Sequence, residues 1–161
     1  MIDLDLLKNN DSNAFNAWHK ANCTNPISFK GQHLQNTFLT DFNLVNIDFS
    51  DSIIEECYFK RVQFWASDFT NVQFKRCYFI SCHFGTPELI DASSYLVDFM
   101  FKAPIFFNTY FFKGNMLNTN FREISLGNSH FDECIFEKCD LRKTILSDTK
   151  GTNSNWLNNL K

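Results

Sequence analysis

The sequence predicts an all-β repeat fold in which short straight segments turn around a common apolar axis. A large apolar residue recurs every five positions from Ile54 through Phe59 and Phe64 to Phe84. A small or β-branched residue, such as Cys57 before Phe59, precedes each of them by two positions. An amphipathic helix has a period of about 3.6 residues and a strand a period of about 2, so neither explains this spacing. The internal repeat therefore decides the fold class ahead of local propensity.

Three segments show the five-residue unit most clearly: SDFTN at 67–71, TNFRE at 119–123 and CDLRK at 139–143. They resemble the repeat of the pentapeptide-repeat family, which is roughly A(D/N)LXX with Leu or Phe in the centre. The resemblance implies a right-handed quadrilateral parallel β-helix, with four pentapeptides in each coil of twenty residues. It implies that the central residue and the small residue two before it point inward and that the other three point outward. It covers roughly residues 27–150.

Three regions follow from where the period begins and ends. Residues 1–24 lack it, and Asp11 or Ser12 is placed to cap a helix running to about Ala21. We expect these residues to form an N-terminal helical cap over the open end of the β-helix, whose strand edges would otherwise be exposed. The β-helix itself is expected over residues 25–150, and residues 151–161, where Trp156 keeps the phase, are expected to form a C-terminal cap.

The phase slips once, near residues 85–100. Leu89 would extend the first run of centres, but the second run begins at Phe101, which lies 17 residues after Phe84. Gly85 and Pro87 supply turn signals at this point. Two arrangements fit the slip. One is a bulge or short loop within one continuous β-helix, which we expect, and the other is a break between two stacked subdomains.

Length and charge limit the classes of partner. A chain of 161 residues suggests one domain, and its net charge of -3 argues against direct binding of nucleic acid or of an anionic membrane. The most apolar segment, 95–112, contains Asp98, Lys102 and Pro104, so it does not resemble a membrane span. The acidic start does not resemble a secretory signal. We therefore expect a cytoplasmic protein.

No constellation of residues points to catalysis, a cofactor or a metal site. Five cysteines, Cys57, Cys77, Cys82, Cys134 and Cys139, occupy the small inward position and are expected to be buried free thiols, which suits a reducing compartment. They are therefore not available as nucleophiles to the histidines at 33, 83 and 130, which the repeat directs to solvent. The sequence has no Gly-rich phosphate loop, no HExxH and no Cys-x-x-Cys pair. We expect a protein that is not an enzyme.

One acidic stripe can be built from the register. Asp48 and Asp68 share an outward column that Glu88 would extend, and Asp51 and Asp91 lie on the same face. Some pentapeptide-repeat proteins, the quinolone-resistance and gyrase-protecting ones, resemble a DNA duplex and bind type II topoisomerases. The resemblance thus implies an alternative function, a DNA-mimicking modulator of DNA gyrase. The simpler interpretation is that these carboxylates make turn hydrogen bonds. Other outward charges, such as Asp41 beneath Arg61, are expected to form ion pairs between coils.

An outward aromatic column offers a candidate contact surface. Phe38, Tyr58 and Tyr78 each precede a centre and lie one coil apart, and Ile80 is on the same face. Stacked aromatic residues on a polar surface are typical of interaction sites. Two other roles fit the same column: it staples successive coils, or the N-terminal helix covers it.

The leading functional interpretation is a non-enzymatic scaffold that binds a protein partner, either an unknown protein or a second copy of itself. A rigid rod with regular outward columns suits such a role. A third interpretation is a purely structural or oligomerising protein, or a secreted effector that anchors by this rod, and nothing in the sequence separates these.

Overall fold

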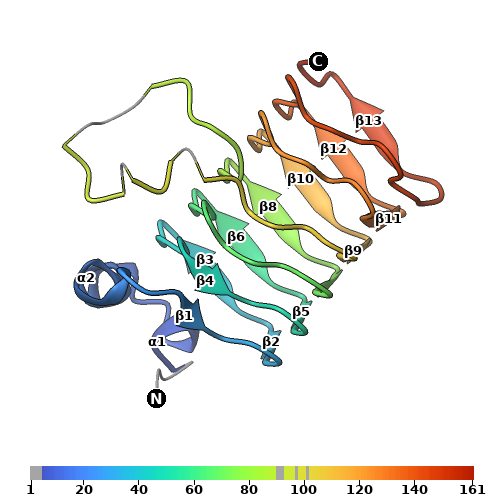
Figure 1. Cartoon of the computed structure of the whole chain (residues 1–161). Coiled ribbons are helices and arrows are strands. Elements are labelled where there is room, and N and C mark those ends of the chain that lie inside the picture. The colour runs from blue at the N-terminus through green and yellow to red at the C-terminus, as the bar shows by residue number, and fades with distance from the viewer. Residues whose placement is uncertain (1–4, 90–92, 97, 101) are drawn as a thin grey trace.

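The chain folds into a parallel β-helix of about six turns with two short helices at its N-terminal end (Figure 1). The structure is a computed structural model that describes residues 5–89, 93–96, 98–100 and 102–161. The predicted fold class, a pentapeptide-repeat β-helix with a short N-terminal helical segment, is confirmed. We call each turn of the β-helix a coil, each large inward residue a centre, and the residue two before it the small position.

The strands form parallel sheets along the sides of the solenoid. The helices are α1 (Asp5–Lys8) and α2 (Ser12–Asn22). A two-stranded sheet pairs β1 (Ile27–Ser28) with β4 (Ile47–Asp48). A five-stranded sheet contains β2 (His33–Gln35), β5 (Ile53–Glu55), β7 (Gln73–Lys75), β9 (Tyr110–Phe112) and β11 (His130–Asp132). A six-stranded sheet contains β3 (Phe38–Thr40), β6 (Tyr58–Lys60), β8 (Tyr78–Ile80), β10 (Asn115–Leu117), β12 (Ile135–Glu137) and β13 (Asn155–Leu157).

The corners of the coils have a fixed backbone conformation. At the regular corners the residue two after a centre has a positive φ, for example 57° at Asn46, 59° at Ala66 and 52° at Arg76, and Thr86 at the start of the excursion is an exception. This left-handed conformation turns the chain onto the next side of the coil, and it is unfavourable for side chains other than Gly, Asn and Asp. Many corners carry Asn or Asp, but Ala66 and Arg76 show that the packed axis imposes the turn on other residue types.

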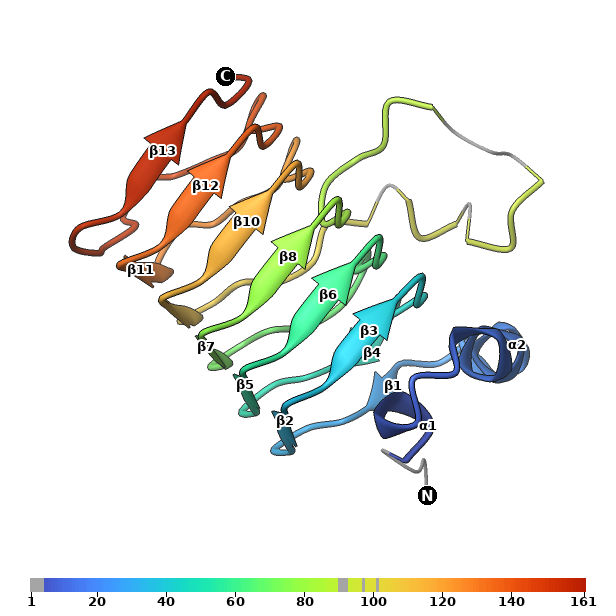
Figure 2. The ribbon, with the colours of Figure 1, turned by 180° about the vertical axis from the view of Figure 1, so that it is seen from behind.

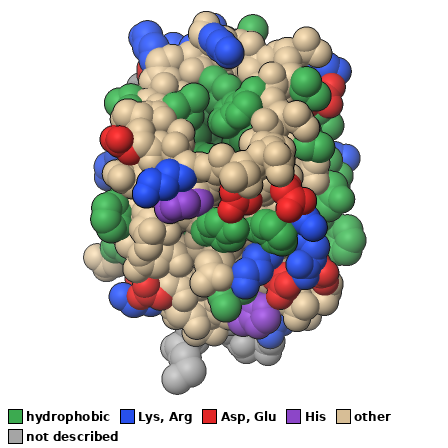
Figure 3. Space-filling view, turned by 90° about the vertical axis from the view of Figure 1, so that its right-hand side faces the viewer, with side chains coloured by type: hydrophobic (Ala, Val, Ile, Leu, Met, Phe, Trp, Pro, Cys, Tyr) green, Lys and Arg blue, Asp and Glu red, His purple; other side chains and the backbone are tan. Residues whose placement is uncertain are grey.

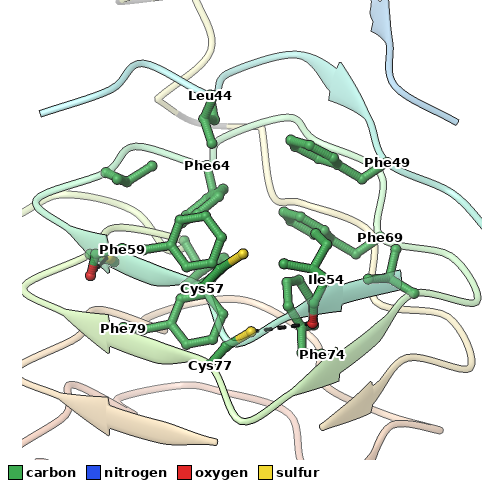
Figure 4. Packing of buried hydrophobic residues seen from close by; sticks show 14 of the residues in the cluster. Leu44, Phe49, Ile54, Cys57, Phe59, Phe64, Phe69, Phe74, Cys77 and Phe79 are labelled. Carbon is green, nitrogen blue, oxygen red and sulfur yellow. Dashed lines mark hydrogen bonds between the residues drawn. The ribbon is translucent and has the colours of Figure 1, made fainter. Parts of the chain in front are cut away.

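The axis is filled by phenylalanine rings, as predicted (Figure 4). Rings in the same column stack nearly parallel, with centroids 5.6 Å apart for Phe49 and Phe69 and 4.5 Å apart for Phe64 and Phe84. Rings on adjacent faces meet edge to face, as Phe64 and Phe69 do at 68°. Both geometries suit the charge distribution of aromatic rings. The centres therefore build an apolar axis along the length of the rod.

The small position stabilises the coil above it through one hydrogen bond. Its hydroxyl or thiol donates to the carbonyl of the centre 23 residues earlier, as Ser67 Oγ does to Leu44 at 2.8 Å and Cys77 Sγ does to Ile54 at 3.3 Å. Figure 4 shows Cys57 and Cys77 one above the other beside the rings. All six cysteines are buried and free, as expected for five of them. Where this position holds Ser, Cys or Thr, the residue is therefore both small and able to donate, whereas Val62 and Val72 fill it by packing alone.

The phase slip is an excursion of 17 residues from the solenoid. Tyr58 pairs with Tyr78, twenty residues later, whereas Tyr78 pairs with Asn115, so the pairing offset grows from 20 to 37 residues. The same sheets continue on both sides, so the β-helix is not broken into two subdomains. The segment is longer than the expected bulge and projects from one side in Figure 1.

The expected position of Leu89 on the axis is wrong, because its side chain is 90% exposed. Phe106 lies beneath Phe69 instead, with ring centroids 5.1 Å apart. Phe101, the expected first centre of the second run, lies outside the described residues. Leu96 and Met100 of the excursion pack on Val45 and Trp65, outward residues of two successive coils, in a second apolar cluster. Local packing thus holds the excursion against the rod.

The two ends of the described chain differ. Asp11 caps α2 by accepting a hydrogen bond from the Ala14 amide at 2.9 Å, and Phe15 packs on the buried Phe42. At the other end, residues 151–161 continue the coil geometry. Trp156 in β13 stacks on Phe136 with centroids 4.0 Å apart, and its side chain is 37% exposed. The expected C-terminal cap is therefore a further coil of the same solenoid.

Candidate interaction face

The six-stranded sheet presents one uncovered face (Figure 2). In that view the helices and the excursion lie to one side of β3, β6, β8, β10, β12 and β13, and neither crosses these strands. Two columns of side chains point outward from the sheet. The column before the centres contains Phe38, Tyr58, Tyr78, Asn115, Ile135 and Asn155, and the column after the centres contains Thr40, Lys60, Ile80, Leu117, Glu137 and Leu157.

The four predicted interface residues all lie on this face. The side chains of Phe38 and Tyr78 are 62% and 47% exposed, and those of Tyr58 and Ile80 are half-buried. Ring centroids are 5.6 Å apart between Phe38 and Tyr58 and 6.2 Å apart between Tyr58 and Tyr78. The rings therefore touch one another but stay open to solvent. Helix α2 packs elsewhere, with Phe15 on Phe42, so the described part of the N-terminus does not cover the column.

Two further apolar residues extend the surface beyond the excursion. Leu117 continues the column of Ile80, and Ile135, which is 38% exposed, follows Asn115 in the column of Tyr78. Sequence reasoning missed both, because placing them beneath Tyr78 and Ile80 requires knowing that the excursion has 17 residues. We call Phe38, Tyr58, Tyr78, Ile80, Leu117 and Ile135 together the apolar face.

Most charges beside the apolar face are neutralised along the corners of the coils. Arg61 makes two hydrogen bonds of 2.6 Å to the Asp41 carboxylate one coil away, as predicted, and this contact lowers the pKa of Asp41. Arg76 likewise binds the carboxylates of Glu55 and Glu56. Such exposed pairs contribute little to stability, because solvent screens them. They keep the rim of the face polar but nearly neutral.

Two charged residues on the face itself lack strong partners. Among the described residues, Lys60 has no carboxylate within salt-bridge distance, and Glu137 reaches only its neighbour Lys138, at 3.6 Å. Lys60 lies one coil before Ile80, and Glu137 lies one coil after Leu117. Ile80 and Leu117 of the after-centre column are therefore flanked by a positive charge on one side and a negative charge on the other.

The candidate acidic stripe is interrupted in the structure. Asp48 and Asp68 do share a column, but Ile105 follows Asp68 there. Glu88 is instead in the excursion, where it pairs with Arg142, so the expected Asp48–Asp68–Glu88 column is wrong. The excursion diverts residues 86–102 from the coil, which explains the error. Asp91 lies outside the described residues.

The remaining carboxylates of the stripe hold turns and ion pairs. Asp48 and Asp68 accept hydrogen bonds from the amides two residues later, at 2.9 and 2.8 Å. Asp51 contacts Lys30 at 3.3 Å and accepts from Asn71. On the face seen in Figure 3, acidic and basic side chains are mixed, and no broad area carries one sign. These contacts match the simpler interpretation of the acidic residues as turn formers.

Comparison with known families identifies the repeat. Residues 115–150 match the model of pentapeptide repeats with eight copies. Residues 115–150 are therefore pentapeptide repeats. These residues include β10, β11 and β12, so the match falls on the regular coils that follow the excursion.

Several solved pentapeptide-repeat structures resemble this chain weakly. Rfr23 from the cyanobacterium Cyanothece 51142 is 16% identical over 77% of this chain and 63% of its own, with a TM-score of 0.23. This chain thus spans less than two thirds of Rfr23. QnrB1, a plasmid-mediated fluoroquinolone resistance protein, is 15% identical over 80% of this chain and 81% of its own, with a TM-score of 0.27.

HetL from the cyanobacterium Nostoc sp. strain PCC 7120, a protein involved in heterocyst differentiation regulation, is 11% identical over 83% of this chain and 69% of its own, with a TM-score of 0.27. The comparison with curated proteins gives no match.

The histidines of the described chain lie apart from the apolar face. His33 is exposed, but His83 is half-buried rather than fully exposed as expected, and burial lowers its pKa. Its Nδ1 is buried and has no hydrogen-bond partner among the described residues. His19 of α2 is buried and bonded to the Val45 carbonyl at 2.7 Å and the Tyr95 hydroxyl at 3.2 Å. Across the described residues, no group of three potential metal ligands and no helix able to span a membrane is present.

Proposed function

We propose that this protein is a non-enzymatic scaffold that binds a protein partner through the apolar face. The observation that carries the proposal is the exposure of Phe38 and Tyr78, at 62% and 47%, on a sheet that neither the helices nor the excursion crosses. Aromatic residues are enriched in the cores of protein interfaces, and a contiguous apolar patch on a soluble protein typically marks such a site. Tyr58 and Tyr78 add hydroxyl groups that can bond to a partner.

The rigidity of the rod supports the same role. Each face residue follows or precedes a buried centre, such as Phe59 or Phe79, and all except Phe38, on the edge strand β3, lie on strands paired on both sides. A preorganised surface loses little conformational entropy on binding. All six cysteines are free and buried, which supports a reducing location such as the cytoplasm.

A double substitution separates an interface from a staple between coils. If the column is an interface, the double variant Tyr58→Glu with Tyr78→Glu should melt within about 2 °C of the wild-type monomer. It should also lose the association that light scattering detects for the wild type. A staple would instead give a large fall in melting temperature. The matched control is Gln35→Glu with Gln73→Glu, which adds the same charge on exposed positions of β2 and β7. A destabilised tyrosine variant, or one that associates as wild type does, would refute the proposed function.

The topoisomerase alternative has less support from the surface. A DNA mimic needs carboxylates where successive phosphates would lie, whereas here Ile105 follows Asp68 and Glu88 is bound to Arg142. A gyrase supercoiling assay decides this alternative. We expect wild type to have no effect up to tens of micromolar, and an effect lost on Asp48→Lys with Asp68→Lys would restore the alternative.

A further inference from the structure

We infer that the apolar face binds a second copy of this chain, packed face to face with the two solenoid axes running in opposite directions. The inference rests on the proposed function and names the partner. It follows from the order of side chains along the two outward columns. That order is nearly self-complementary when the sheet is reversed end to end.

The after-centre column carries the charge complementarity. From β6 to β12 it reads Lys60, Ile80, Leu117 and Glu137. We place a two-fold axis between the two copies, parallel to the strands and above the space between β8 and β10. Rotation about this axis puts β8 of one copy over β10 of the other, and β6 over β12. Lys60 of one copy then faces Glu137 of the other, and Ile80 faces Leu117. Because a two-fold interface uses each contact twice, two Lys60–Glu137 pairs flank two Ile80–Leu117 contacts.

The before-centre column adds a fit of shape. Tyr58 of one copy faces Ile135 of the other, and Tyr78 faces Asn115. Asn115 is a short residue between two larger ones, and it lies in a hollow lined by Tyr78, Ile80, Leu117, Ile135 and Glu137. The half-exposed ring of Tyr78 is therefore placed to enter the hollow of the second copy. The short Asn115 in the hollow of one copy therefore faces a large ring of the other copy.

The other face-to-face arrangement lacks this complementarity. A two-fold axis parallel to the solenoid would set each strand over its own copy, so that Lys60 faces Tyr58 and Glu137 faces Ile135. Burying a carboxylate against an isoleucine side chain without a partner is costly. In the reversed arrangement Arg61 faces Lys138 at the corner, but the Asp41 carboxylate already holds Arg61. The charges on the face therefore favour the reversed arrangement.

The size of the surface predicts a weak dimer. Six strands spaced by about 4.8 Å span roughly 24 Å, and the outward residues of each strand span roughly 10–16 Å. The area that this surface can bury on each copy is therefore below the roughly 800 Å² per partner of standard interfaces. We therefore expect dissociation in the range of about 10–100 µM, where weak specific complexes lie.

Charge reversal provides the test, measured by sedimentation equilibrium from 1 to 300 µM. Lys60→Glu and Glu137→Lys each place like charges at both symmetry-related sites, so each alone should weaken the dimer about tenfold or more. Mixing the two single variants should form a heterodimer, and Lys60→Glu with Glu137→Lys in one chain should restore the homodimer, because both cases bring opposite charges together again. Lys75→Glu on β7 is the matched control and should dimerise as wild type does.

A wild-type chain that stays monomeric at 300 µM would overturn the inference. So would single charge variants that dimerise as tightly as wild type, or a mixture that fails to associate. These outcomes are distinct from failure of the proposed function, which is shown by the melting temperature of the Tyr58→Glu and Tyr78→Glu variant. If charge reversal has no effect but that variant is stable and no longer associates, the face binds and only the reversed arrangement is wrong.

Discussion

Phe69 stacks on Phe106 with ring centroids 5.1 Å apart, although 37 residues separate them where the repeat elsewhere needs 20. The axis therefore continues without a gap across an inserted segment. The coils before and after the excursion are set by the stacking of their centres, and the 17 additional residues lie outside the solenoid. The excursion is held by packing on Val45 and Trp65 rather than by strand pairing.

Removing the excursion should leave the solenoid folded. Deletion of residues 86–102 joins Gly85 to Ala103 and restores the twenty-residue offset between successive coils. We expect the β-sheet circular dichroism spectrum to be kept, with a loss of about 2–4 kcal/mol as Val45 and Trp65 become exposed. Deletion of residues 86–101, one residue fewer, is the control. It leaves one extra residue between Phe84 and Phe106, which must bulge from the corner and should lower the free energy of unfolding further.

The axis should be far more sensitive to truncation than the outer face. Phe64→Ala leaves a cavity in a stacked column and should cost about 3–5 kcal/mol. Phe38→Ala removes a ring that is 62% exposed and should cost less than about 1 kcal/mol. Urea unfolding of both variants measures the difference. Similar losses would mean that the assigned register is incorrect.

A corner alanine should be improved by glycine. Ala66 has φ of 59°, a left-handed conformation that glycine adopts without steric cost. We expect Ala66→Gly to raise the free energy of unfolding by about 0.5–1 kcal/mol. The same substitution at exposed Ala17, inside α2, should lower it by about 0.5–1 kcal/mol. Calorimetry on the pair tests the sign, and a loss at both positions would contradict the corner geometry.

Buried histidines should make stability depend on pH in a defined window. Burial lowers the pKa of His19 and of His83 below the ordinary value of 6.5. The unfolded chain therefore binds more protons than the folded chain below about pH 6.5, and stability falls as pH decreases from about 7 towards the lowered pKa values. His19→Gln, which stays neutral, should show a smaller fall between pH 7.5 and 5. An identical pH profile would show that His19 does not titrate in this way.

The parts of the structure that could be predicted are those that follow directly from the five-residue repeat. The centres, the inward thiols and the pair of Asp41 and Arg61 all follow from positions within the five-residue unit. The excursion was not predictable, because Leu89 continues the period by coincidence and then points to solvent. Each prediction that aligned an outward column across residues 86–102 was therefore wrong or incomplete. Glu88 was therefore assigned to the wrong column, and Leu117 and Ile135 were missed on the apolar face.

The central claim is that the apolar face becomes covered when the protein associates. Hydroxyl-radical footprinting with mass spectrometry measures it directly, by comparing wild-type protein at 1 µM and at 200 µM. We predict that labelling of Phe38, Tyr78 and Ile135 falls at the higher concentration. Phe107 and Leu89, which are 59% and 90% exposed outside the apolar face, should be labelled equally at both. Unchanged labelling of Phe38 and Tyr78, or protection of Phe107 in their place, would contradict the account.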